Sequence, residues 1–403
     1  MPPLGHGWAA RLCWPLLWLS ITSTGFAGWE LTPPGDPNRN WSTTVTLRGV
    51  YDDNFNATQN GRQSGLRFGS DIRLRAKVPI EKLFIGLDYD YGDEYPRDSE
   101  LGGVNQSHNV NVSVNYVFNP RLALSVSETF IQSLEPQLSS PFNVVQAGTY
   151  VYDNVVATMG FALTPRWNLS VAESWDIWRY QVSSVASNSD HEDYQTTASA
   201  IHTLDPRTSV GLNYQYGRTL FTNPGTNDAL NAQSHSLYVS FVRRFNPQLS
   251  LQLSGGYSIR ESDDGGSSTA PYAAGSLIYN YGPDSAISAT VAHSLSEATV
   301  GITRDFSTAE TTTFLLQVNH RLTARLVALA NVSYAFSNFE QPLQNRTLSA
   351  DEQALTTHLG LTYVFRVWLS AEAGYTYTKL ESPDLPGRSY DRNQISLGAT
   401  LSY

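Results

Sequence analysis

A run of charged residues between positions 67 and 90 is the part of this sequence best suited to act on ions. Apolar and polar side chains alternate through both halves of the run, and seven of the polar positions are charged: Arg67, Asp71, Arg73, Arg75, Lys77, Asp88 and Asp90. Alternate residues of a β-strand face opposite sides, so these seven side chains would share one face. Charged side chains on a channel wall select ions by sign. The sequence therefore predicts that these seven residues line a pore.

The pairing of these charges decides whether the pore wall would select ions by their sign. If Val78 pairs with Leu83 across a hairpin, Arg73 falls opposite Asp88 and Arg75 falls opposite Gly86. Opposite charges directly across two strands stabilise their pairing. Two interpretations stay open. Unpaired guanidinium groups would bias a pore toward anions, whereas cations that pair with carboxylates of the same wall would only fill it.

Metal binding and catalysis are not indicated by the other polar residues. Two acidic runs, at residues 52–56 and 261–266, resemble calcium loops but lack a closing Glu at the required spacing. The eight His residues are scattered, no Gly-x-Ser-x-Gly elbow occurs, and Cys13 is the only Cys. We therefore expect no catalytic residue, no metal site, no cofactor and no enzymatic activity.

The composition favours a surface that alternates between lipid and water. Charged residues make up 15% of the chain and aromatic residues 12%, with 22 Tyr, whereas soluble proteins carry about 25% charged residues. Beyond the N-terminus no apolar run is long enough for a membrane helix. A net charge of −10 argues against a nucleic-acid partner. Low charge, many Tyr and short apolar runs together are typical of a transmembrane β-barrel.

Short turn signals recur about every 40 residues along the chain. They lie at residues 79–81, 119–120, 164–165, 205–206, 246–247, 282–284, 321–323 and 365–366. Most of them place Pro beside Asn, Asp, Thr or Gly, which set or tolerate turn dihedrals. The flanking segments, such as residues 110–118 and 355–365, alternate strictly between apolar and polar side chains. This period of two identifies them as strands and excludes helices.

Long polar stretches separate these hairpins, at residues 52–65, 92–107, 135–146, 183–190, 222–233, 261–269, 297–307, 337–350 and 381–387. Short periplasmic turns that alternate with longer extracellular loops are typical of transmembrane barrels. Eight turns join sixteen strands, and residues 41–51 and 390–403 add one strand at each end. The sequence predicts an all-β, closed, antiparallel up-and-down barrel of about eighteen strands. A soluble β-propeller would need four short strands per repeat, where this repeat offers two long ones.

The N-terminal residues carry the order of a secretory signal. Arg11 precedes an apolar stretch at residues 12–21, and Gly25 and Ala27 supply the small residues of a cleavage site. The stretch is too short to span a membrane. We expect a signal peptide at residues 1–27, a short periplasmic segment at 28–40 and the barrel at 41–403. Its expected location is the outer membrane of a Gram-negative bacterium.

Several segments resemble a known family. The last strand, residues 393–403, alternates and ends on an aromatic residue, like the C-terminal strand that the outer-membrane assembly machinery recognises, so Tyr403 is a candidate assembly signal. Residues 50–54 and the hairpins at 116–122 and 363–370 resemble the putative β-barrel porin 2 family. The resemblance implies an outer-membrane barrel, often linked to exopolysaccharide export, and it brings no catalytic residues.

Two carboxylates fit this scheme badly. On strict alternation Glu128 and Glu173 would face lipid, where a charged side chain is costly. Either a bulge inverts the alternation there, or the two residues lie at the rim of the barrel or at a subunit contact. The sequence leaves these alternatives open.

The expected function is a porin-like channel for the passive passage of small polar solutes or saccharides, tied to exopolysaccharide export. The alternative is a structural or surface-exposed barrel with an occluded lumen and no transport role. Expected partners are outer-membrane lipid, lipopolysaccharide, the barrel assembly machinery and polysaccharide. The oligomeric state stays open.

Overall fold

The alternating segments form eighteen strands in a computed structural model that describes residues 39–96, 104–133, 149–222, 231–263, 265–297, 308–343, 346–385 and 387–403. The strands are β1 (Trp41–Asp52), β2 (Gly65–Pro79), β3 (Leu83–Pro96), β4 (Asn105–Asn119), β5 (Leu122–Ser133), β6 (Tyr150–Ala162), β7 (Trp167–Tyr180), β8 (His191–Asp205), β9 (Thr208–Phe221), β10 (Ala232–Arg244), β11 (Leu249–Ser262), β12 (Ser267–Gly282), β13 (Ser285–Glu297), β14 (Thr308–Arg321), β15 (Leu326–Leu343), β16 (Arg346–Arg366), β17 (Leu369–Glu381) and β18 (Tyr390–Ser402). One short helix, α1 (Ser183–Ser189), precedes β8. The predicted signal peptide and most of the predicted periplasmic segment lie outside the described residues.

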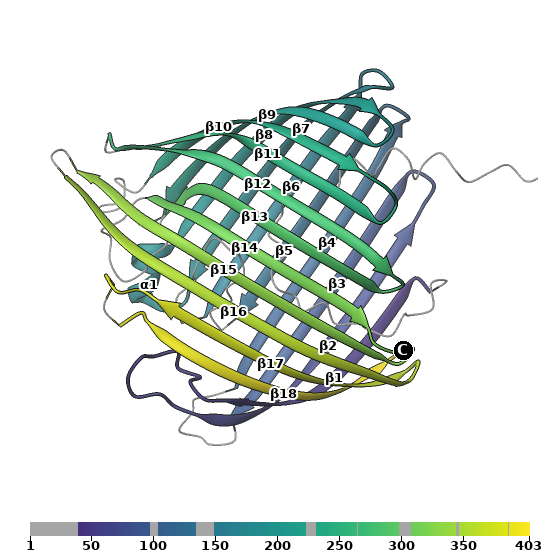
Figure 1. Ribbon diagram of the computed structural model, residues 1–403, viewed down its shortest axis with the longest axis vertical. Helices are drawn as coiled ribbons and strands as arrows, with labels where there is room; N and C mark the ends of the chain where they lie inside the picture. The colour runs from purple at the N-terminus through teal and green to yellow at the C-terminus, as the bar shows by residue number, and fades with distance from the viewer. Residues whose placement is uncertain are drawn as a thin grey trace, which may run out of the picture.

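Consecutive strands pair in antiparallel fashion, and β1 pairs with β18 to close the sheet into a barrel of tilted strands (Figure 1). The closing register runs from Thr44 opposite Ser402 to Asp52 opposite Gln394. Beyond it, the amide of Tyr403 donates a hydrogen bond of 2.9 Å to the carbonyl of Thr43. The predicted closed barrel of about eighteen antiparallel strands is confirmed.

The short turns are held by the polar residues that the sequence places beside Pro. The Asn119 side chain accepts hydrogen bonds from the amides of Arg121 (2.9 Å) and Leu122 (3.1 Å). The Asn246 side chain does the same for Gln248 and Leu249, each at 2.8 Å. Side-chain acceptors of this kind replace a backbone turn and fix the direction of the next strand. All eight predicted short turns join the expected pairs of strands.

Several of the polar stretches contain more regular structure than the sequence suggests. Residues 92–96 and 105–107 belong to β3 and β4, and α1 lies within residues 183–190. The expectation of a loop over residues 337–350 is wrong, because β15 and β16 pair up to Leu343 and Arg346. Polar side chains are tolerated there because this hairpin extends past the other strands, at the long-loop end of the barrel where water is accessible. In the described part of the chain, no helix is long and apolar enough to cross a membrane.

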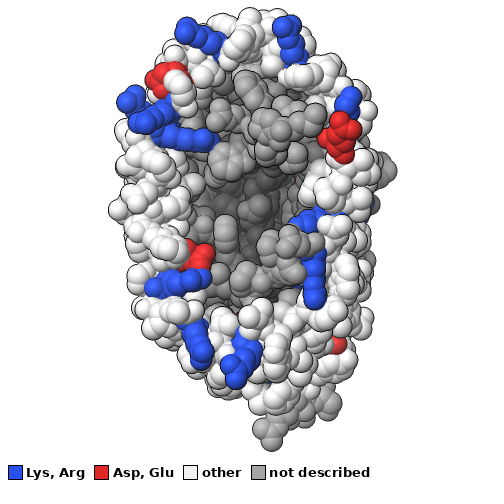
Figure 2. Space-filling model, turned by 90° about the vertical axis from the view of Figure 1, so that its right-hand side faces the viewer, with Lys and Arg blue, Asp and Glu red and all other residues white. Residues whose placement is uncertain are grey.

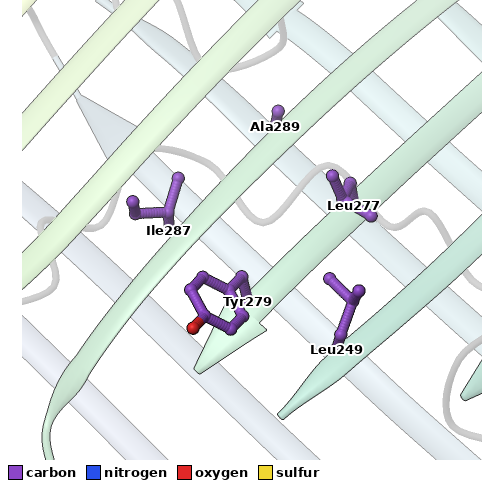
Figure 3. Close-up of a pocket in the computed structure, with 5 residues that line it drawn as sticks. All are labelled: Leu249, Leu277, Tyr279, Ile287 and Ala289. Atoms are coloured by element: carbon purple, nitrogen blue, oxygen red, sulfur yellow. The ribbon is translucent and has the colours of Figure 1, made fainter. Parts of the chain in front are cut away.

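The two faces of the sheet differ in chemistry. Large apolar side chains such as Leu47, Leu212, Leu237 and Leu397 are exposed and share the outer face. On β11–β13 this face carries a shallow depression lined only by apolar residues and one Tyr (Figure 3): Leu249, Leu277, Tyr279, Ile287 and Ala289. An apolar belt of this kind matches the hydrocarbon of a membrane.

The inner face carries mostly polar residues. Small apolar clusters occur at the long-loop end, where Tyr150 and Tyr180 pack with Trp178 and with Ala186 of α1. On β11, a Cβ at Gly256 would lie 2.1 Å from the carbonyl oxygen of Leu237, so only glycine fits there. The Tyr238 and Tyr272 rings approach to 4.7 Å across this gap. The fold therefore presents lipid-compatible side chains outside and polar side chains inside.

Candidate pore wall

A group of charged residues lies on the inner face of four neighbouring strands, β18, β1, β2 and β3; Figure 1 shows how these strands are arranged. We call this surface the charged wall. Its members are Arg392, Arg48, Asp52, Arg67, Asp71, Arg73, Arg75, Lys77, Asp88, Asp90 and Glu94. The intervening residues Phe68, Leu74, Val78 and Leu87 are exposed on the opposite, outer face. All seven candidates from the sequence therefore share one face; their role in lining a pore stays a prediction.

The register of β2 against β3 differs from the one considered above. Val78 pairs with Ile85, so Arg73 lies opposite Asp90 and Arg75 lies opposite Asp88. The assumed pairs were wrong by two residues because the turn closes more tightly, with reciprocal hydrogen bonds between Ile80 and Leu83. A shift of two residues leaves every side chain on its predicted face.

Ion pairs join the two strands at mid-wall. The Arg73 Nε atom lies 3.0 Å from Asp88 Oδ1 and 2.8 Å from Asp90 Oδ1. The Arg75 Nε atom lies 2.9 Å from Asp88 Oδ2. Each guanidinium thus has a carboxylate partner on the same wall. Of the two interpretations left open by the sequence, this geometry favours paired charges that fill the wall over a ladder of unpaired cations.

A second cluster lies toward the long-loop end and was not recognised from the sequence. Asp52 is its centre: its side chain is fully buried, 2.9 Å from Arg67 Nη2 and 2.8 Å from Arg392 Nε. The exposed fractions of the Arg67 and Arg392 side chains are only 7% and 9%. Because two arginines share this one buried carboxylate, removal of any one of the three side chains should destabilise the protein strongly.

Glu94 extends this cluster across β2. Its carboxylate accepts hydrogen bonds from Arg67 Nη1 at 2.7 Å and from Arg48 Nη2 at 2.9 Å, and Arg48 Nε also lies 3.3 Å from Asp71. Arg48 is on β1 and Glu94 is on β3, so this ion pair bridges over a whole strand. Inward parity was the only sequence signal for these residues.

The inner face of β12–β15 is different. In the described strands β12–β15, the inward positions between Ser268 and Phe339 carry Ser, Thr, Asn, Gln and apolar residues. We call this surface the uncharged wall. Its side chains bond to one another, as in Thr311 to Ser337 at 3.0 Å and Ser288 to Gln317 at 3.2 Å.

The acidic residues at 52–56 have structural partners. Asp52 binds the two arginines, while Asp53 accepts hydrogen bonds from the amide and side chain of Asn393 at 2.6 and 2.7 Å. The buried Asn54 side chain donates to the carbonyl of Asp391 at 2.8 Å. These contacts fasten the end of β1 to β18. Among the described residues, no group of three or more potential ligands is placed to hold a metal ion.

Glu128 and Glu173 lie on the outer face. Glu128 pairs with Val112 and Val155, and Glu173 pairs with Ala157 and Thr196, in registers without a bulge near either residue. The bulge considered above is therefore wrong. Each residue is the seventh of its strand from the short turn, which corresponds to about 15 Å of height in a tilted strand, near the middle of the apolar belt. This height also excludes the rim.

The two carboxylates differ in their neighbours. The Thr196 hydroxyl contacts both Glu173 carboxylate oxygens, at 2.9 and 2.8 Å. Glu128 is exposed and has no polar partner among the described residues. The third alternative, a subunit contact, stays a prediction.

Comparison with known proteins assigns the chain to a family. A model of the family described as "Putative beta-barrel porin 2" matches residues 41–403. No curated protein matches the chain. Among solved structures, OpdL of Pseudomonas aeruginosa is 14% identical with a TM-score of 0.46, over 90% of this chain and 99% of that one.

Two further structures from the same organism resemble the chain to a similar degree. The outer membrane protein OpdK is 12% identical with a TM-score of 0.45, over 90% of this chain and 99% of that one. The siderophore receptor PirA is 11% identical with a TM-score of 0.44, over 92% and 81%. These overlaps are too loose to carry an argument about this chain.

Proposed function

Since the chain belongs to the putative beta-barrel porin 2 family, we propose that it is a passive channel of the bacterial outer membrane for small polar solutes and saccharides. Membership of a porin family also points to a channel and away from an enzyme. The finer suggestion, a role in exopolysaccharide export, rests on the family resemblance alone.

One observation carries the proposal: a closed ring of eighteen strands with exposed apolar side chains outside and polar side chains inside. Barrels of sixteen to eighteen strands are wide enough to hold an aqueous channel. Because the cations of the charged wall are paired with carboxylates, the wall offers polar contacts without a large excess of either sign. The wall itself therefore does not select strongly between charged and uncharged solutes.

Liposome swelling tests the proposal directly. Purified protein in liposomes is mixed with isosmotic sugars of increasing size, with protein-free liposomes as the control. We expect swelling rates that fall steadily as the sugar becomes larger. Swelling no faster than in protein-free liposomes, for a barrel shown to be folded, would instead support a structural barrel with an occluded lumen.

A further inference from the structure

The short-turn end of the barrel repeats one backbone contact from hairpin to hairpin. At seven short turns, the backbone carbonyl of one residue accepts a hydrogen bond of 2.8–3.0 Å. The donor is a backbone amide near the end of the next even-numbered strand. The acceptor residues are Lys82, Arg121, Arg166, Arg207, Gln248, Arg325 and Trp368. The shared contact makes these positions structurally equivalent, and five of the seven carry a cation.

These equivalent positions share the parity of the lumen. Arg121 lies two residues before Ala123, and Arg207 lies two residues before Ser209, both on the inner face of their strands. Lys82 likewise precedes Phe84, which has the parity of Asp88. Because side chains alternate along a strand, these cations lie on the side of each turn that faces the opening of the barrel.

Further cations gather at the same end. Together with Arg243, Arg244, Arg321 and Arg366 at the strand ends, the short turns and their flanks carry nine exposed Lys and Arg residues among the described residues. Figure 2 shows Lys and Arg distributed around the whole opening, with few carboxylates between them. The carboxylates of the short turns and their flanks are Glu81, Asp205 and Asp284, and Asp284 is already paired with Arg321.

We call the ring of cations on the short turns and their flanks the rim. Its charge differs from that of the charged wall and from that of the whole chain. In the described part of the chain, no carboxylate lies within ion-pair distance of the side chains of Lys82, Arg121, Arg166 or Arg325. The chain as a whole has a net charge of −10. A cationic ring on an acidic protein focuses the field at that opening and raises the local concentration of anions.

We propose that this basic rim binds anionic saccharides, those that carry carboxylate groups, and admits them from the short-turn side. The inference rests on the proposed channel function and specifies its substrate class and its direction of entry. Arginine forms paired hydrogen bonds to carboxylates. The charged wall further in is internally paired, so a bound anion meets no deep electrostatic trap after the rim. Weak binding beyond the mouth is a requirement for conduction.

Binding of a fluorescent trigalacturonate to the folded protein in zwitterionic detergent tests the rim. The variant combines Lys82→Gln, Arg121→Gln, Arg166→Gln and Arg207→Gln. The matched control combines Arg62→Gln, Arg179→Gln, Arg218→Gln and Lys379→Gln, which removes the same number of cations from the long-loop end. We expect the rim substitutions to weaken binding about tenfold at low salt and the control to change it less than twofold. Equal binding by the rim variant and the native protein would overturn the proposal.

Two further measurements separate other causes. In nanodiscs, a difference between native protein and variant that disappears when phosphatidylglycerol replaces part of the phosphatidylcholine would assign the rim to lipid headgroups and contradict the proposal. Conductance of the same proteins in planar bilayers isolates the channel function. Rim-dependent binding without conductance would contradict the channel function but support the anion site. Conductance without rim-dependent binding would contradict only the anion site.

Discussion

The charged wall and the uncharged wall follow the same backbone pattern with opposite chemistry. On β1–β3 and β18, inward residues join strands through ion pairs such as Arg67 to Asp52 at 2.9 Å. On β12–β15, inward residues join strands through hydroxyl contacts such as Thr311 to Ser337 at 3.0 Å. A barrel interior needs hydrogen-bonded side chains rather than a particular type of residue. The two walls should therefore differ in how far the free energy of unfolding falls when one contact is removed.

The largest effect is expected at the buried centre of the charged wall. Asp52→Asn keeps the shape of the side chain but removes the charge shared by Arg67 and Arg392. Two buried guanidinium groups then share one carboxylate fewer, which is costly, so we expect the free energy of unfolding to fall by about 3 kcal/mol. Unfolding by urea from phospholipid vesicles, followed by tryptophan fluorescence, measures it.

The matched change on the uncharged wall is Thr311→Val, at a fully buried hydroxyl that contacts Ser337. One neutral hydrogen bond contributes about 1 kcal/mol, so the loss should be clearly smaller. Equal losses for both variants would remove the distinction between the two walls.

The next effect concerns ion selectivity. Arg73→Ala leaves Asp90 without its partner at 2.8 Å, and Arg75→Ala removes one of the two partners of Asp88. The wall becomes more negative in each case, so we expect the cation-to-anion permeability ratio to rise about twofold, more for Arg73. Reversal potentials in a salt gradient measure the ratio. Thr313→Val on the uncharged wall is the control; unchanged selectivity in both arginine variants would show that these charges do not border the conducting path.

A smaller effect is expected on the outer face. Glu128→Leu replaces an exposed carboxylate at mid-height with an apolar residue, and should raise the free energy of unfolding by about 1 kcal/mol in vesicles. Val126→Leu, on the same face of β5, serves as the control. A decrease for Glu128→Leu would indicate that the carboxylate is held by a partner protein in the membrane.

The smallest effect is expected at a loop ion pair near the long-loop end. A hydrogen bond from Arg218 holds the pKa of Asp263 below its usual range. A depressed folded-state pKa stabilises the protein above the unfolded pKa, and this contribution disappears as the pH falls through the folded value. Because the pair is exposed, the contribution should stay below about 1 kcal/mol. Unfolding of Asp263→Asn and native protein should differ at pH 7 and converge in acid; an equal difference at both pH values would contradict this.

The sequence predicted the barrel better than its interior. Alternation and Pro-containing turns such as Asn119–Pro120 act locally, so strand number and facing could be inferred. The register of β2 against β3 depends on how tightly residues 80–83 turn, which composition does not specify. The hairpin over residues 337–350 was misjudged because polar residues can form strands beyond the membrane.

The buried cluster at Asp52 shows a different limit. Asp52 and Arg392 are separated by 340 residues and meet only because β1 pairs with β18 in one register. No local pattern encodes that register. The seven candidates on β2 and β3 were found because they lie on strands adjacent in sequence, whereas the contact of Arg392 with Asp52 requires the closed barrel.

Accessibility of neighbouring residues on β4 tests the central claim most directly. Cys13 is the only cysteine of the sequence and lies in the predicted signal, so single cysteines can be placed in a thiol-free barrel. Ser113 lies on the inner face opposite Gly86, and Val114 lies on the outer face opposite Ile85. With a membrane-impermeant charged thiol reagent, we expect Ser113→Cys to be labelled with a fall in conductance and Val114→Cys to stay unlabelled. Labelling of Val114→Cys but not Ser113→Cys in the folded barrel would contradict a water-filled lumen behind a lipid-facing surface.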